Sequence, residues 1–166
     1  MKKHEFELLA PAGSFEILKA VLAAGADAVY LAGNRYGARA YADNFGQDEL
    51  IEAIRYAHLF GVKVYLTVNT IFKNKETEQL ADFIRPFYEV GLDGVIVQDL
   101  GVLAYMKQHF PDMERHISTQ MTVTSVEGAR FLVENGASRV VPARELTMEE
   151  LKAMCEAGIE VESFIH

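Results

Sequence analysis

Short apolar runs alternate with amphipathic stretches along the whole chain, and this alternation is the feature that most constrains its fold. The apolar runs predict strands at 6–10, 28–32, 62–68, 94–98, 115–119, 139–142 and 160–165. The amphipathic stretches predict helices at about 14–24, 47–60, 75–90, 100–109, 125–135 and 148–157. Such alternation is typical of parallel strands joined by right-handed crossovers, in a doubly wound sheet or a closed barrel.

Glycines mark the expected helix ends, since each of the following stands between a helical stretch and an apolar run: Gly25, Gly61, Gly91, Gly136 and Gly158. Two of these junctions nearly repeat, as Gly25-Ala26-Asp27 and Gly91-Leu92-Asp93. Because both aspartates precede their strands, we predict that they stabilise the fold rather than serve a site.

Three helix starts also carry capping signals. Asn74 is placed to cap the helix at 75–90. The pairs Thr124 with Glu127 and Thr147 with Glu150 have the spacing of a capping box, which predicts helix starts at both places.

The sequence favours a barrel over an open sheet. The segment 10–14 contains one glycine and lacks the glycine-rich fingerprint of a dinucleotide-binding sheet, whereas polar residues follow most strands, as at a barrel rim. We predict an α/β protein of the (β/α)8 TIM-barrel type, with residues 1–166 as a single incomplete domain. Seven strands and six helices fall short of eight βα units, so we expect either a fragment or self-association through the open edge.

Net charge, apolar runs and cysteine content argue against several classes of protein. The net charge of −8 argues against a basic nucleic-acid clamp spread over this chain, although a local RNA-binding patch is compatible with it. No apolar run reaches the roughly 18–20 residues of a membrane helix, and the start does not resemble a signal peptide. Because the chain has a single cysteine, we expect a cytoplasmic protein in a reducing compartment.

Polar side chains at the expected strand ends are the candidate site residues. Those predicted to bind substrate are Arg39, Asn69, Gln98, Ser118, Gln120, Arg144, Glu145 and Glu162. Those predicted to be catalytic are Asp99, His116 and His166. The amides suit a planar polar ligand and Arg39 an anion. Structural alternatives stay open: Asp99 could cap the next helix, and Arg144 could pair with Glu145.

Several chemistries lack their motifs. The chain has no Gly-x-Ser-x-Gly elbow and no His-Glu-x-x-His zinc helix, and we predict no metal site within it. No lysine stands at a strand end, because Lys63 lies near the start of its strand, which disfavours Schiff-base catalysis. Cys155 falls inside a helix, where we expect a buried small hydrophobe rather than a nucleophile.

A set of short blocks in a fixed order resembles the N-terminal portion of peptidase family U32, the collagenase-like proteins. The blocks are residues 7–13, 25–30, 37–39, 42–44, 68–70, 97–99, 118–121, 143–146 and 162–166. The resemblance implies an enzyme that acts on RNA or a peptide. The function that the resemblance favours is iron–sulfur-dependent hydroxylation of a base in ribosomal or transfer RNA. The alternatives are a collagenase-like peptidase and a non-catalytic barrel that binds RNA or protein.

The family signature begins at Glu162 and continues past His166 to the cysteines that hold the cluster. The resemblance therefore implies that the cysteine-bearing segment is absent from this chain, since Cys155 matches none of those ligands. We expect the chain to hold no cofactor itself, to fold and to be inactive alone.

Overall fold

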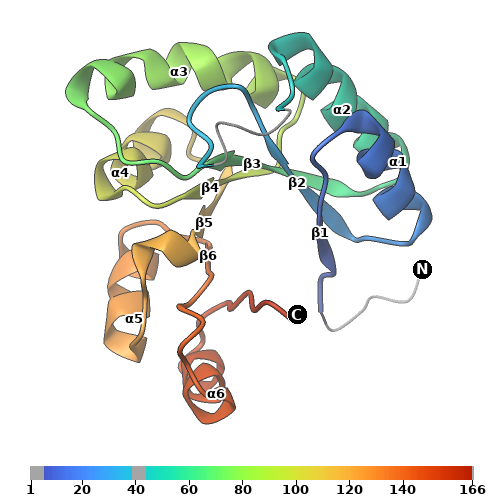
Figure 1. The fold of residues 1–166 in the computed structure, drawn as a ribbon. Helices are drawn as coiled ribbons and strands as arrows, with labels where there is room; N and C mark the ends of the chain where they lie inside the picture. The colour runs from blue at the N-terminus through green and yellow to red at the C-terminus, as the bar shows by residue number, and fades with distance from the viewer. Residues whose placement is uncertain (1–5, 39–43, 166) are drawn as a thin grey trace. The chain divides into compact units, whose positions relative to one another are not determined.

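Figure 1 shows the computed structural model, which describes residues 6–38 and 44–165. Strands and helices alternate along the chain as β1 (Leu9–Pro11), α1 (Phe15–Ala23), β2 (Ala28–Ala32), α2 (Gln47–Leu59), β3 (Lys63–Val68), α3 (Asn74–Glu89), β4 (Gly94–Val97), α4 (Leu100–His109), β5 (Glu114–Ile117), the 3-10 helix η1 (Thr119–Met121), α5 (Val126–Glu134), β6 (Arg139–Val140) and α6 (Met148–Glu156). The described chain is thus an α/β fold with six strands and six α-helices, and every predicted helix forms within one residue of its expected bounds. No described helix combines the length and the apolar character needed to span a membrane.

The chain divides into two compact units, of which the first comprises the described residues of 6–68 together with 82–93. In this unit β1, β2 and β3 are parallel, with Leu9 opposite Ala28 and Ala28 opposite Lys63. Apolar side chains of these strands and of α1 and α2, such as Leu31 and Ile54, are buried. The parallel register brings the carboxyl ends of the three strands to one edge.

The second unit comprises residues 69–81 and 94–165 of the described chain. Here β4, β5 and β6 are parallel, with Ile96 opposite His116 and His116 opposite Arg139. Because partners in register point to the same side of a sheet, these three side chains lie in one row. The buried core of the unit includes Leu103 and Ile117.

The prediction of a strand at 160–165 is wrong. This segment makes a single parallel bridge, Val161 to Val140, with hydrogen bonds from Val140 N to the Glu160 carbonyl and from Glu162 N to the Val140 carbonyl, both 2.9 Å long. The partner strand β6 is itself only two residues long, and Pro142 has no N–H to donate. A ladder this short gives the last segment little to pair with.

The two Gly-x-Asp turns have the structural role predicted for them. Asp27 Oδ2 accepts from Leu8 N at 2.8 Å, and Asp27 N donates to the Leu8 carbonyl at 2.9 Å. The second turn repeats both bonds, with Val64 N to Asp93 Oδ2 at 2.8 Å and Asp93 N to the Val64 carbonyl at 3.2 Å. Each aspartate therefore ties its own turn to the start of the preceding strand.

A third turn of the same kind, missed in the sequence, uses a serine. Arg115 N donates to Ser138 Oγ at 3.2 Å, and Ser138 N donates to the Arg115 carbonyl at 2.8 Å. The Arg115 guanidinium adds bonds to the carbonyls of Phe110, Pro111, Met113 and Gly136. Burial lowers the pKa of Arg115 below the usual arginine value, although a guanidinium stays charged.

Two predicted helix caps are wrong by one residue. The cap of α5 is Ser125 rather than Thr124, because the extended backbone of Ser125 lets its Oγ accept from Gly128 N at 3.1 Å. Helix α3 already includes Asn74, and the residue before it, Lys73, donates its N–H to Glu76 Oε2 at 2.8 Å.

The prediction that Cys155 is buried is also wrong, because the residue is exposed. Its neighbour Met154 is the buried side chain of α6. Successive residues on a helix point about 100° apart, so the register that buries Met154 turns Cys155 toward solvent.

The turn clamp gives a testable expectation for stability. Asp93 accepts from both Val64 N and His58 Nε2, the latter at 2.9 Å, so Asp93→Ala leaves two groups without an acceptor. We expect a loss of roughly 1–3 kcal/mol in the free energy of unfolding, measured by urea denaturation. Asp82→Ala, at an exposed position of α3, is the matched control, and equal midpoints for both variants would contradict the clamp.

The capping box of α6 predicts a pH dependence. Thr147 N and Oγ both donate to Glu150 Oε2, at 2.7 and 3.0 Å, and the backbone bond is the main reason that the pKa of Glu150 is lowered. A lowered folded-state pKa contributes stability above the unfolded pKa, and this is lost as the pH falls through the folded value. We therefore expect Glu150→Gln to be less stable than the wild type at neutral pH, with the gap closing in acid. Glu149→Gln is the control, and a gap that stays constant from neutral pH into acid would refute the expectation.

Candidate functional site

Polar side chains gather at the carboxyl ends of β4 and β5 in the second unit. Ser118 N donates to the Val97 carbonyl at 2.7 Å, which continues the β4–β5 pairing past the ends of both strands. Gln98 follows β4 and is half-buried, while Ser118 is almost fully buried. Gln98 and Ser118, both predicted to bind substrate, therefore lie at adjacent strand ends, where parallel α/β proteins place their ligands.

Asp99, predicted to be catalytic, has the structural role that was the alternative reading. Its Oδ1 accepts from Val102 N at 3.0 Å and caps α4, and its Oδ2 accepts from Phe72 N at 3.3 Å. Both oxygens thus hold backbone groups, one of them in the segment that follows β3. Asp99 fixes the geometry of this strand end through those two bonds.

The segment after β5 is fixed by its own hydrogen bonds. Ser118 Oγ accepts from Gln120 N at 3.3 Å, and Thr119 Oγ1 donates to the Pro142 carbonyl at 3.2 Å. Gln120 itself is exposed, and Thr122 adopts a left-handed conformation with φ 58°. The residues from Met121 to Ser125 then line a shallow groove of about 280 Å³ against α5. Of these predicted residues, Gln120 is the one presented to solvent.

Arg144 and Glu145 follow β6 and are both exposed. The guanidinium of Arg144 lies 4.5 Å from the centre of the Phe164 ring, a cation–π contact that holds an otherwise flexible side chain. Phe164 was not predicted from the sequence, although it stands two residues after the predicted Glu162. The contact presents a planar cation at the carboxyl end of β6.

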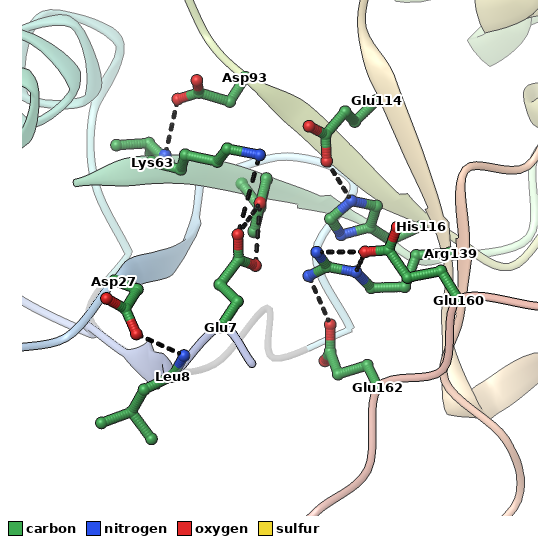
Figure 2. A network of polar contacts seen from close by, with 12 residues as sticks. Glu7, Leu8, Asp27, Lys63, Asp93, Glu114, His116, Arg139, Glu160 and Glu162 are labelled. Atoms are coloured by element: carbon green, nitrogen blue, oxygen red, sulfur yellow. Dashed lines mark hydrogen bonds and ion pairs between the residues drawn. The ribbon is translucent and has the colours of Figure 1, made fainter. Parts of the chain in front are cut away.

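His116 and Glu162, two further predicted residues, belong to a polar network on one face of this sheet (Figure 2). His116 is fully buried, and its Nε2 lies 2.9 Å from Glu114 Oε2. In the next strand Arg139 binds Glu160 at 2.7 Å and Glu162 at 3.4 Å. Glu114, Arg139 and Glu160 were missed, although the two-residue alternation of β5 already placed Glu114 on the side of His116.

The first unit has a network of its own on β3. Glu7 accepts from the Tyr65 hydroxyl at 3.0 Å and pairs with Lys63 Nζ at 3.8 Å, as Figure 2 shows for Glu7 and Lys63. This Lys63 contact lies toward the amino end of the strand, in agreement with the prediction that it is no strand-end nucleophile.

The structure says less about three further predicted residues, Asn69, Arg39 and His166. Asn69 follows β3 and is half-buried. Arg39 and His166 lie outside the described residues.

The residues present do not fit an iron–sulfur cluster. Such clusters are held by several cysteine thiolates, and this chain has one cysteine, exposed on α6. Over residues 6–38 and 44–165, no three His, Cys, Asp or Glu side chains form a group that could hold a metal ion.

Comparison with known proteins gives a family match and clear relatives. The model of peptidase family U32 matches residues 13–166. The chain is 39% identical over 161 residues to a tRNA hydroxylation protein P1 of Bacillus subtilis, covering 96% of this chain and 38% of that protein. It is 38% identical over 167 residues to the 23S rRNA 5-hydroxycytidine C2501 synthase of Escherichia coli, covering 100% of this chain and 25% of the synthase.

Another relative, from Porphyromonas gingivalis, is named collagenase and is 33% identical over 94% of this chain and 37% of its own length. Among solved structures, the U32 peptidase Mk0906 superposes with a TM-score of 0.78 at 16% identity, over 98% of this chain and 70% of that one. This similarity shows the fold. The chain spans between a quarter and two fifths of the length of these three curated relatives.

The salt bridges of Arg139 predict that Arg139 and Glu160 contribute unequally to the stability of the fold. Arg139→Met removes the guanidinium that faces Glu162, whose side chain is 18% exposed, so we expect a loss of roughly 1–3 kcal/mol in unfolding free energy. Glu160→Gln should cost less than about 1 kcal/mol, because the Glu160 side chain is 59% exposed. Urea denaturation of both variants measures the difference, and a larger loss for Glu160→Gln would overturn this account.

Proposed function

The chain belongs to peptidase family U32, and from that membership we propose that it contributes a (β/α)8-barrel region to an enzyme that hydroxylates a base of ribosomal or transfer RNA. The observation that carries the proposal is the identity of 39% and 38%, over nearly the whole chain, to two proteins named for tRNA hydroxylation and for 5-hydroxycytidine synthesis in 23S rRNA. These names support the proposed substrate, and the alternation of strands and helices supports the proposed barrel.

The polar groups at the strand ends support recognition of a base. Gln98 and Gln120 are uncharged amides that can match the edge of a base by paired donors and acceptors. Arg144, held against Phe164, offers a planar cation of the kind that stacks on unpaired bases. RNA bases are read in single-stranded segments by such combinations of stacking and edge contacts.

We also propose that the iron–sulfur cluster of the hydroxylation reaction is held by cysteines outside these 166 residues, because this chain has one cysteine. When bound, such a cluster supplies electron transfer. The residues of this chain would then bind and orient the RNA, in the cytoplasm, and the chain alone would be inactive.

A collagenase-like peptidase is the second candidate, favoured by the relative from Porphyromonas gingivalis. A serine peptidase would need a hydroxyl nucleophile and a histidine base, and Ser118 and His116 are poorly placed for these roles. His116 is 0% exposed and bonded to Glu114, and Ser118 is 3% exposed with its Oγ accepting from a backbone N–H. Because a peptide bond must reach the nucleophile, we rank peptidase activity below RNA hydroxylation.

The proposal is tested in cells that lack the complete gene. Their digested transfer and ribosomal RNA should lose a nucleoside one oxygen heavier than its parent, detected by mass spectrometry, and the full-length wild-type gene should restore it. Arg144→Ala should restore about a tenth of the wild-type level or less, because the planar cation is lost. Arg130→Ala, at an exposed arginine of α5, is the control and should restore it fully. Unaltered RNA together with gelatin cleavage by the purified protein would establish the peptidase instead.

A further inference from the structure

The shallow groove beyond the carboxyl end of β5 is open to solvent and neutral. It is lined by the first residue of α4, by the segment 121–125 and by residues of α5, all within the second unit. None of these described lining residues carries a charge. Its volume of about 280 Å³ lies near the lower end of the range for small-ligand sites, roughly 300–1,000 Å³, so the groove suits a single ring system.

The segment along one side of the groove is held in a costly conformation. Thr122 has φ 58°, in the left-handed region that β-branched residues rarely adopt. Its N–H donates to the Thr119 carbonyl at 3.0 Å. The carbonyl of the next residue, Val123, accepts from Ala143 N at 2.9 Å. Backbone strain that is fixed in this way by surrounding bonds is typical of binding sites.

The strained turn determines which side chains face solvent at the groove. Val123 is buried, whereas Thr122 and Thr124 on either side of it are exposed. Thr122 Oγ1 donates to the Gln120 carbonyl at 3.4 Å, and a hydroxyl that donates still has lone pairs to accept with. The segment therefore offers the groove hydroxyl groups that can form single neutral hydrogen bonds.

Helix α5 contributes an apolar wall with an aromatic ring. An added Cβ at Gly128 would lie 3.1 Å from Ser125 Oγ and 3.8 Å from Val123 Cγ1. Glycine here preserves the helix cap and leaves this part of the groove unfilled, although it lowers helix stability relative to alanine. Phe131 lies one turn further along the same face and is 54% exposed. The groove thus presents an aromatic ring to solvent.

We infer that this groove binds the base of the nucleotide next to the one that is hydroxylated, with that base stacked on the Phe131 ring. Proteins commonly hold the bases of single-stranded RNA by stacking them on aromatic side chains. A base has two apolar faces for such contacts, and its edge can bond the threonine hydroxyls. A phosphate would lose hydration there without gaining a counter-charge, and an aliphatic side chain would cover the hydroxyls without bonding them.

The place of the groove in the fold supports a neighbouring nucleotide. Met121, which lines the groove, directly follows Gln120, one of the amides proposed to contact the base. A nucleotide in the groove would therefore adjoin a base held at the ends of β4 and β5. The inference rests on the proposed function, since it names a second contact to the same RNA.

Equilibrium binding of RNA trinucleotides to the full-length protein tests the inference. One probe is uridine–cytidine–uridine, and the other has the same backbone with both uracils removed. Wild type should bind the intact probe about tenfold more tightly, because stacking of one base is worth a factor of this order. Phe131→Leu, which keeps an apolar side chain without a ring, should bind both probes about equally, whereas Phe131→Tyr should keep the preference. Phe60→Leu should also keep it and is the matched control, since Phe60 is 55% exposed at the end of α2.

The outcomes separate this inference from the proposed function. The same preference in Phe131→Leu as in wild type, or no preference in wild type, would overturn the inference and leave RNA hydroxylation standing. Equal losses of affinity for both probes in Phe131→Leu would assign the ring a structural role and also overturn it. Displacement of the intact probe by the peptide Gly-Phe-Gly would assign the groove to a peptide and overturn the base contact. A wild type that neither binds the trinucleotide nor hydroxylates RNA would remove both proposals.

Discussion

The strand register of this protein depends on a reciprocal bond pair in the turns that lead into β2, β4 and β6. In each turn a side-chain oxygen of Asp27, Asp93 or Ser138 accepts the N–H at the start of the preceding strand, and the same residue's own N–H donates to that strand. A one-residue slip would break both bonds and turn every side chain to the other face. The clamps thus decide which residues reach the carboxyl end of each strand and on which side.

That fixed register produces the same order of side chains in both units. On β3 the face runs from Lys63 through Tyr65 to Thr67, and on β5 from Glu114 through His116 to Ser118. Near the amino ends Lys63 and Tyr65 both contact Glu7, and His116 contacts Glu114. Each face ends at the carboxyl side in a small hydroxyl residue. The hydroxyl of Ser118 is used by the turn that follows it, and the hydroxyl of Thr67 has no bond within the described chain.

The periodicity of the sequence was sufficient for the helices, for most strands and for the aspartate clamps, because each of these is determined by local pattern. It failed where tertiary context decides. The segment at 160–165 reads as a strand, but β6 offers it too short a ladder. Cys155 is apolar enough for a core, yet Met154 occupies it.

The candidate site was harder to predict for the same reason. Gln98, Ser118 and Arg144 follow the ends of β4, β5 and β6, as the strand pattern predicted, and their role in binding substrate stays a prediction. Burial and partners are long-range properties, so the sequence could not show that His116 is sealed against Glu114. Phe164 was missed because a single aromatic residue outside a strand or helix is an ordinary feature of a sequence. Its meaning comes from its contact with the Arg144 guanidinium.

The net charge of the chain bears on which parts of an RNA hydroxylase contact the phosphates and which contact the base. Affinity for RNA comes mainly from neutralising phosphates, and a chain of net charge −8 is poorly suited to that. Specificity comes from contacts to bases, which need neutral donors, acceptors and stacking surfaces rather than net charge. The strand ends here carry amides, hydroxyls and one arginine stacked on an aromatic ring. On the proposed function, this region therefore selects and orients the base, and the phosphate contacts that hold the RNA are made elsewhere in the enzyme.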